Sequence, residues 1–193
     1  IINRTLATTG SAIHLATYGV IHRIRVFLYT PIFGLNQGLA PLVGFNAGKG
    51  HMDRAKTAFT LALMSAVGLL ILLTFLFQLF SAETMSFFAR GSKFEAAGDL
   101  ALRTSTLLIA LTSLPIVLGT FTLSLGYSGL SSLLSLSRQI LFFIPFAVLF
   151  HHITGIMGIW YAYLLSDLLS FLLGLVIARY IFRKMKETTF QPT

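Results

Sequence analysis

Long uncharged stretches of apolar residues dominate the chain. The segment from Thr57 to Ala82 carries no charged residue and is dense in Leu and Phe, and the segment from Thr104 to Ser137 is uncharged for 34 residues. A helix needs about 20 predominantly apolar residues to cross the hydrocarbon core of a membrane. The pattern therefore predicts an all-α integral membrane protein. The predicted spans are residues 11–46, 57–82, 104–126, 133–150 and 155–178.

Gly, Pro and polar residues mark where these helices turn or bend. Gly126-Tyr-Ser-Gly129 is the predicted turn inside the second long uncharged stretch, and Pro115 and Gly119 interrupt the helix before it. Membrane helices tolerate such residues when neighbouring groups satisfy the freed backbone. In the first span, Pro31 is expected to kink the helix. Residues 1–9 are expected to be the end of an earlier helix, which makes five full transmembrane helices plus a stub.

The composition supports a surface that faces lipid. Hydrophobic residues make up 55% of the 193, charged residues 10%, and the mean hydropathy is +0.84. A soluble domain carries about 25% charged residues, so this chain has too few of them to cover a surface that faces water. The absence of cysteine excludes a disulfide framework and thiolate metal sites. The chain begins at Ile1 without a signal-peptide pattern, which suggests a piece of a longer protein.

The excess of basic residues predicts the orientation in the membrane. Fourteen Lys and Arg against six Asp and Glu give a net charge of +8. In a soluble protein this charge would suggest nucleic acid as a partner, but in a membrane protein it indicates cytoplasmic loops. One set of loops is assigned Lys49, Arg54, Lys56, Arg138, Arg179, Arg183, Lys184 and Lys186, and the other Arg4, Arg90, Lys93 and Arg103. We therefore expect a multi-pass protein of the plasma membrane (a bacterial inner membrane), with the Lys49 loop and the C-terminus in the cytoplasm, residues 87–98 outside, and no nucleic-acid partner.

The glycine-rich stretch GLNQGLAPLVGFNAGKG, residues 34–50, is not a phosphate-binding loop. A P-loop needs Gly, four residues and then Gly-Lys-Ser/Thr after a strand. Here Gly44 precedes Gly48-Lys49 by three residues, and Gly50 replaces the hydroxyl residue. The stretch also ends a membrane helix, whose negative dipole end repels phosphate.

The same stretch resembles the multidrug and toxic compound extrusion (MATE) family. Its members carry a similar helix end, followed by a basic cytoplasmic loop. The matching positions here are Gly34, Leu35, Gln37, Pro41, Leu42, Val43, Gly44, Asn46, Gly48 and Arg54. Lys49 departs from the small residue that is commoner there. LSLSRQILFFIP (residues 134–145) and GIMGIWYAYLLSD (residues 155–167) are similar to the family's eleventh-helix entry and twelfth-helix start, and Arg23 falls where its eighth helix often carries an Arg.

The resemblance implies twelve helices in two lobes of six, with a substrate cavity between the lobes. The five spans would be helices eight to twelve, which form most of the C-terminal lobe, and the N-terminal lobe of the same transporter would be the partner. The resemblance also implies efflux of small cationic amphiphilic drugs, driven by a transported proton or sodium ion, without a cofactor. Alternating access needs both halves, so this chain is not expected to transport alone.

Asp167 is the candidate coupling residue, because it is the one carboxylate deep in a predicted span. Such a charge is costly in a bilayer and suggests an ion site. A structural alternative is a hydrogen bond in a polar patch with Ser166 and Ser170, or pairing with an Arg. Arg23 and Arg25 diverge by about 200° around a helix, so one can line the cavity while the other pairs, and Asp167 is a possible partner. The amides of Asn36 and Gln37 are candidates for the substrate path or for bridges between helices.

Two alternatives remain at this point, a flippase and a protease. A lipid-linked oligosaccharide flippase of the same superfamily would share the fold and handle larger anionic cargo. An intramembrane serine protease would use Ser128 with His151 or His152, and a Ser–His pair needs hydrogen-bond reach. The predicted topology separates these residues by about 30 Å, one bilayer thickness. The spacing of the His residues does not predict a metal site.

Overall fold

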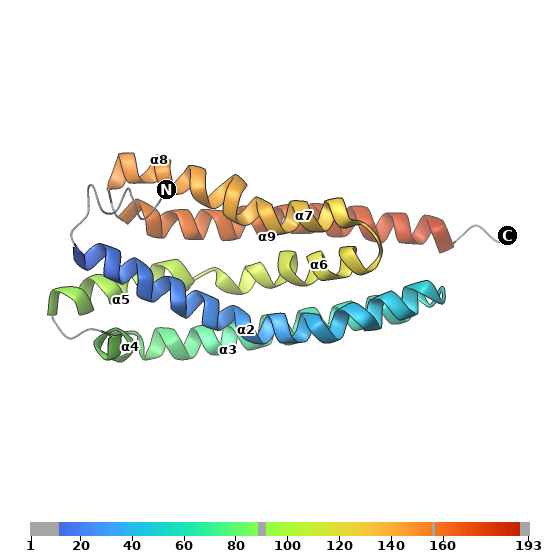
Figure 1. Cartoon of the computed structure of the whole chain (residues 1–193), viewed down its shortest axis with the longest axis horizontal. Coiled ribbons are helices and arrows are strands. Elements are labelled where there is room, and N and C mark those ends of the chain that lie inside the picture. The colour runs from blue at the N-terminus through green and yellow to red at the C-terminus, as the bar shows by residue number, and fades with distance from the viewer. Residues whose placement is uncertain (1–11, 89–91, 156, 190–193) are drawn as a thin grey trace.

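The computed structural model describes residues 12–88, 92–155 and 157–189 of the chain, and these form a bundle of long helices (Figure 1). The helices in chain order are α2 (Ala12–Gly48), α3 (Met52–Leu79), α4 (Ser81–Phe88), α5 (Ser92–Thr106), the 3-10 helix η1 (Ile109–Thr112), α6 (Ser113–Ser124), α7 (Ser128–Leu136), the π-helix η2 (Ser137–Phe143), α8 (Ile144–Thr154) and α9 (Met157–Thr189). The described residues contain no strand, which confirms the predicted all-α class.

Four of the helical segments are long and apolar enough to cross a membrane, and a fifth crossing is formed by a bent pair. The four are residues 16–48, 52–79, 128–154 and 157–185, and the bent pair is residues 98–106 with 109–124. The bounds of α2 lie within two residues of the predicted span 11–46, whereas α9 ends at residue 189 instead of 178. The predicted stub, residues 1–9, lies outside the described residues.

The break in the fifth crossing lies earlier in the chain than the sequence predicted. The two parts meet at an angle of 42° between Thr106 and Ile109, whereas Pro115 lies in the first turn of α6. Hydroxyl groups satisfy carbonyls around the break: Thr106 donates to Leu102 at 2.8 Å, and Thr112 donates to Ile109 at 2.6 Å. Polar side chains can stabilise a helix break at membrane depth in this way. By contrast, Pro31 lies inside the continuous α2.

The helices alternate in direction, so the chain's turns gather at two ends of the bundle. The turn after α2, the α6–α7 turn and the C-terminal end of α9 lie at one end, and α4 and the α8–α9 turn lie at the other (Figure 1). Gly126 forms part of the α6–α7 turn with φ +86°, a conformation that favours glycine. The predicted alternation is therefore present in the fold. Arg138 is the exception: it lies within the crossing of residues 128–154, so its assignment to a loop was wrong.

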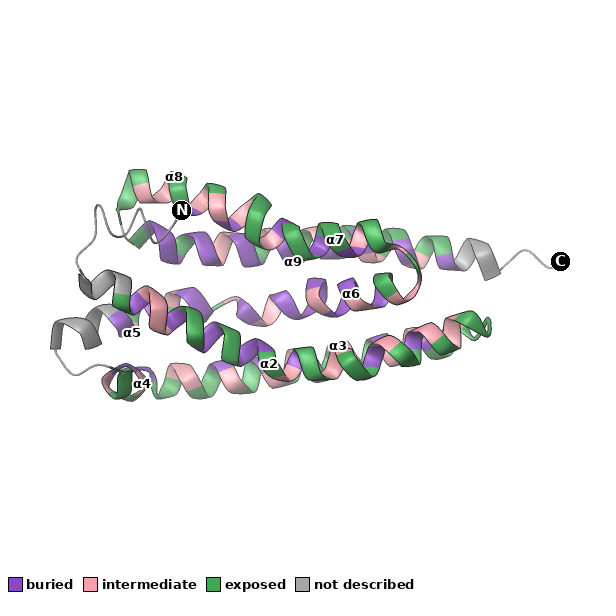
Figure 2. Cartoon of the chain, viewed as in Figure 1, coloured by how far each residue is buried: buried purple, intermediate pink, exposed green. Residues whose placement is uncertain are grey.

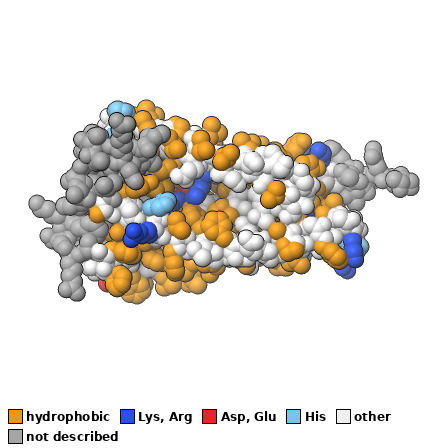
Figure 3. All heavy atoms as spheres, in the orientation of Figure 1, with side chains coloured by type: hydrophobic (Ala, Val, Ile, Leu, Met, Phe, Trp, Pro, Cys, Tyr) orange, Lys and Arg blue, Asp and Glu red, His pale blue; other side chains and the backbone are white. Residues whose placement is uncertain are grey.

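The outer surface is apolar, as expected of a surface that contacts lipid. Figure 3 shows hydrophobic side chains spread over one face of the bundle, and the helices turn mostly buried positions toward one another (Figure 2). In the core, Phe59 of α3 packs against Phe121 of α6 with 4.8 Å between ring centroids and against Phe182 of α9 with 5.6 Å. Three helices thus meet at one aromatic cluster.

The α8–α9 hairpin depends on one close approach at Gly158. A Cβ added at this position would overlap the backbone of Phe150. We predict that Gly158→Ala lowers the free energy of unfolding by about 1–3 kcal/mol, as overpacking of a tight contact does. Thermal melting of the detergent-solubilised protein measures this change. The control is Gly68→Ala in α3, where an added Cβ meets nothing within 4 Å. Equal melting temperatures for the two variants would contradict the prediction.

Candidate functional site

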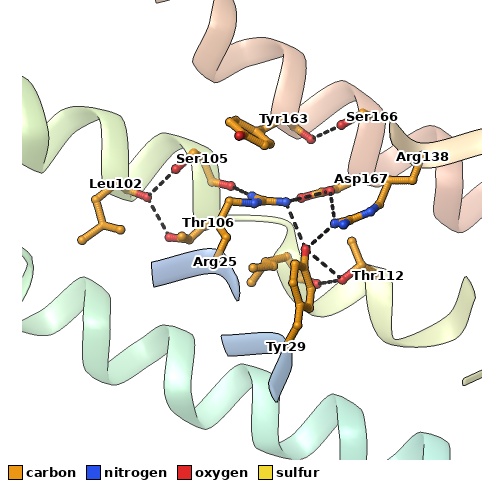
Figure 4. A network of polar contacts seen from close by, with 11 residues as sticks. Arg25, Tyr29, Leu102, Ser105, Thr106, Thr112, Arg138, Tyr163, Ser166 and Asp167 are labelled. Carbon is orange, nitrogen blue, oxygen red and sulfur yellow. Dashed lines mark hydrogen bonds and ion pairs between the residues drawn. The ribbon is translucent and has the colours of Figure 1, made fainter. Parts of the chain in front are cut away.

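A buried ion pair connects the first and last described helices. Asp167 of α9 is 0% exposed and Arg25 of α2 is 3% exposed. Nη2 of Arg25 donates to both carboxylate oxygens of Asp167, at 3.0 and 2.8 Å (Figure 4). The structure therefore forms one of the pairs that the sequence suggested. A buried carboxylate loses its hydration, and an oppositely charged hydrogen-bond partner offsets the free-energy cost of that loss.

The break between α5 and α6 supplies another contact to Arg25. Nη1 of Arg25 donates to the backbone carbonyl of Ser105, in the last turn of α5 (Figure 4). Carbonyls in the last turn of a helix lack a partner within the helix, and a cation is favoured there. Nη2 also donates to the hydroxyl of Tyr29 at 3.1 Å, and the guanidinium lies 4.3 Å from the ring centroid of Tyr163. Arg25 thus connects α2, α5 and α9.

Arg138 adds a second cation to the same cluster. It belongs to the π-helix η2, and its Nη1 donates to the Tyr29 hydroxyl and lies 3.7 Å from Oδ1 of Asp167. Its guanidinium also lies 4.8 Å from the centre of the Tyr29 ring. π-Helical turns are rare and occur frequently at functional sites. The wider turn places a guanidinium inside the bundle, next to a carboxylate that Arg25 already pairs.

The cluster contains two arginines and one carboxylate, so one positive charge has no counter-charge within it. Among the described side chains, the other acidic residues lie toward the ends of the bundle: Asp53 and Asp99 pair with Lys56 and Arg103 on their own helices, and Glu83 lies in α4. Asp167 is therefore the carboxylate that faces both Arg25 and Arg138.

Two cavities adjoin the cluster, and both are lined by Arg138. The smaller, which we call the arginine cavity, measures about 170 Å³. The larger, which we call the polar cavity, measures about 490 Å³. Tyr29 and Phe33 also line both of them. The remaining residues of the polar cavity are Asn36, Gln37, Pro115, Ile116, Gly119, Thr120, Leu123, Ser131, Leu134, Ser135 and Ser170.

The polar cavity holds polar atoms without a partner in the described part of the chain. Nδ2 of Asn36 donates to the carbonyl of Ile116 at 3.5 Å, but its Oδ1 accepts no hydrogen bond. The hydroxyl of Ser170, a fully buried residue, likewise has no partner. Buried polar groups are rarely left unsatisfied, so such atoms beside a cavity indicate a place for water or a ligand.

The predicted site residues fall into different surroundings. Arg25 and Asp167 lie in the cluster, and Asn36 and Gln37 line the polar cavity. Arg23 is exposed and lines a separate outer groove with Glu83. Whether any of them couples transport or binds substrate stays a prediction.

The protease hypothesis loses its geometric basis. Ser128 begins α7 and His151 lies in the last turn of α8, so about 35 Å of helix separates them at 1.5 Å per residue. His152 is one residue further along. Within the described residues, no group of His, Asp and Glu side chains is arranged to hold a metal ion.

Arg138 and Tyr29 were missed as site residues from the sequence. Arg138 directly follows 34 uncharged residues. This position could have indicated a charge within a crossing, but a charge after an apolar run also marks the usual end of a span. Tyr29 carried no signal, because a single Tyr in a membrane helix has no special pattern.

The buried pair generates a stability prediction. Asp167→Asn should lower the free energy of unfolding by about 3–5 kcal/mol, because it leaves buried cations unpaired. Arg25→Gln should have a similar effect, and the double variant should cost less than the sum of the two. Thermal melting in detergent measures all three, and Asp53→Asn, whose side chain is fully exposed, should leave the melting temperature unchanged. Additive single effects would show that the pair does not stabilise the fold.

Comparison with known proteins identifies the family of the chain. The MatE family model matches residues 1–149. Solved structures share the fold: MATE in the bent conformation has a TM-score of 0.91 at 21% identity, covering 98% of this chain and 42% of that one. The outward-facing and inward-facing conformations of a multidrug resistance MATE family transporter of the MOP superfamily both have TM-scores of 0.89 at 20% identity, covering 96% and 97% of this chain and 42% and 44% of theirs.

The chain therefore spans less than half the length of the transporters that it matches. No curated protein matches it in a sequence search. The family model covers most of the residues, and the bundle superposes on transporter structures over nearly its whole length. This multi-pass membrane chain belongs to the MatE family of transporters.

Proposed function

We propose that the chain is the C-terminal half of a cation-coupled multidrug efflux antiporter, and that the polar cavity lines its substrate path. The observation that carries the proposal is the cavity itself, about 490 Å³ in volume and lined by amide, hydroxyl and guanidinium groups in an otherwise apolar bundle. Polar groups at membrane depth mark substrate and ion pathways in transporters.

Transport requires a second half in this proposal. The matched transporters are more than twice as long as the region that this chain covers, and their solved forms include inward-facing and outward-facing conformations. Secondary transporters change between such forms by rocking one repeat against the other around the site. An N-terminal half of six helices would therefore supply the opposite wall of the cavity, and this chain alone would not transport.

The coupling ion, a proton or sodium, would bind in that N-terminal half. A coupling carboxylate must be able to exchange its ion, whereas Asp167 is held by two hydrogen bonds from Arg25 and lies near Arg138. The described residues 104–124 of the fifth crossing contain Thr and Ser but no carboxylate. In this proposal Asp167 stabilises the fold and the position of the arginines, and the coupling role first considered for it is assigned elsewhere.

The family resemblance favours small cationic amphiphilic drugs as substrates. The second candidate is a flippase for a lipid-linked oligosaccharide, and the specific observation in its favour is the excess positive charge at Arg25 and Arg138. Its cargo is anionic and would be attracted by that charge.

Efflux measurements test the path. In the full-length protein, expressed in cells that lack their own multidrug pumps, Asn36→Leu and Gln37→Leu should each slow ethidium efflux about three- to tenfold at unchanged abundance, the range expected from one lost hydrogen bond. Asn46→Leu is the matched control, because its amide donates to the Leu42 carbonyl of its own helix at 2.8 Å. If all three variants export ethidium at the wild-type rate, the polar cavity is not the path.

Cysteine labelling tests the orientation. The end of the bundle with the Lys49 turn is proposed to be cytoplasmic, because the basic loop residues gather there. In full-length protein without other cysteines, Thr154→Cys in intact cells should react with an impermeant maleimide, and Lys49→Cys should react only after permeabilisation. Both positions are exposed and lie at opposite ends of the bundle. The reverse labelling pattern would invert the topology.

A further inference from the structure

We infer that Arg138 and Ser170 form a binding site in the polar cavity for the carboxylate of an anionic amphiphilic compound. The inference rests on the proposed function, because it names the substrate class of the same cavity, and it differs from the family expectation of cationic drugs. Three observations carry it: the charge balance of the cluster, the free donor capacity of Arg138, and the unpartnered hydroxyl of Ser170.

The charge balance leaves a cation facing the cavity. Asp167 compensates one positive charge, and both of its oxygens accept from Arg25. Arg138 approaches the same carboxylate only to 3.7 Å, beyond hydrogen-bond distance. An uncompensated charge at membrane depth is costly, and an anionic group in the cavity removes that cost. A cationic substrate would increase it.

The two arginines differ in how far their donors are used. A guanidinium has five N–H donors, and Arg25 directs its terminal nitrogens at Asp167, Tyr29 and the Ser105 carbonyl. In the described part of the chain, Arg138 donates to the Tyr29 hydroxyl alone. Its side chain is 25% exposed and lines the polar cavity, whereas Arg25 is buried and does not. Arg138 therefore retains donors for a planar carboxylate, which matches a guanidinium geometrically.

The cavity also offers a neutral donor on its α9 side. The Ser170 hydroxyl is fully buried, lines the polar cavity, and has no partner among the described residues. It lies one turn after Asp167 on α9, while Arg138 comes from η2, so the two donors reach the cavity from different helices. Oδ1 of Asn36 is an acceptor without a partner, and it suits a hydroxyl, an amide N–H or a water beside the carboxylate.

The cavity size limits the ligand. About 490 Å³ holds a small organic molecule, and Tyr29, Phe33 and Leu123 provide apolar contacts in the same cavity. The site therefore fits an aromatic or aliphatic compound with one carboxylate.

Fluorescent probes that share one dye and differ in charge test the site. Dansylglycine carries a carboxylate and dansylcadaverine an ammonium group, and each is titrated into the purified full-length protein in detergent while dansyl emission is followed. We expect dansylglycine to bind at least tenfold more tightly than dansylcadaverine. Arg138→Gln should weaken dansylglycine about tenfold or more, Arg138→Lys should weaken it less, and Ser170→Ala should weaken it about three- to tenfold. Arg179→Gln, an exposed position on α9, is the control and should leave it unchanged.

The outcomes separate this inference from the proposed path. Equal binding of the two probes, or unchanged dansylglycine binding in Arg138→Gln, overturns the anion site. If the Arg138→Gln protein fails to fold, Ser170→Ala and Arg138→Lys decide the result, and unchanged dansylglycine binding in both overturns the site. If ethidium efflux persists but dansylglycine does not bind, the anionic substrate class is wrong and the proposed path still holds. If the Asn36→Leu and Gln37→Leu variants export ethidium at the wild-type rate, the proposed path itself is wrong.

Discussion

The contact on which the rest of the site depends is the ion pair of Arg25 and Asp167. It links α2 to α9 through their side chains at the level where α5 ends, and the same guanidinium donates to the Ser105 carbonyl of the interrupted helix. Lipid provides little force to bring apolar helices together, so polar contacts and close packing must do so. One arginine therefore connects three helices and allows one of them to bend.

Several features of the fold were predictable from the sequence because they depend on large, simple signals. Uncharged runs longer than the bilayer thickness indicate membrane crossings, and the Gly126 turn was visible as a glycine-rich interruption. Helix ends were less accurate, because the limits of an uncharged run do not specify where the backbone hydrogen bonding of a helix stops. The bend at residues 106–109 was missed, since hydroxyl groups rather than proline stabilise it.

The candidate site was only partly predictable, and the reasons are physical. A carboxylate in an apolar span is conspicuous, so Asp167 and its possible Arg partners could be named. The choice of Arg25 over Arg23 needed the rotation of α2 about its axis, which sequence periodicity does not specify when the helix is apolar almost all round. Arg138 was assigned to a loop because charges usually end a span, and its contacts with Asp167 and Tyr29 depend on three-dimensional proximity.

The π-helix has a consequence for the whole crossing formed by α7, η2 and α8. A π turn holds more residues than an α turn, so the helical phase before Ser137 does not continue after Phe143. The exposed and buried positions along α8 are therefore out of phase, in the sequence, with those along α7. A single helical wheel drawn through this crossing would assign lipid-facing and inward-facing positions incorrectly on one side of the π-helix. Two wheels with separate phases describe it, and Arg138 lies where they join.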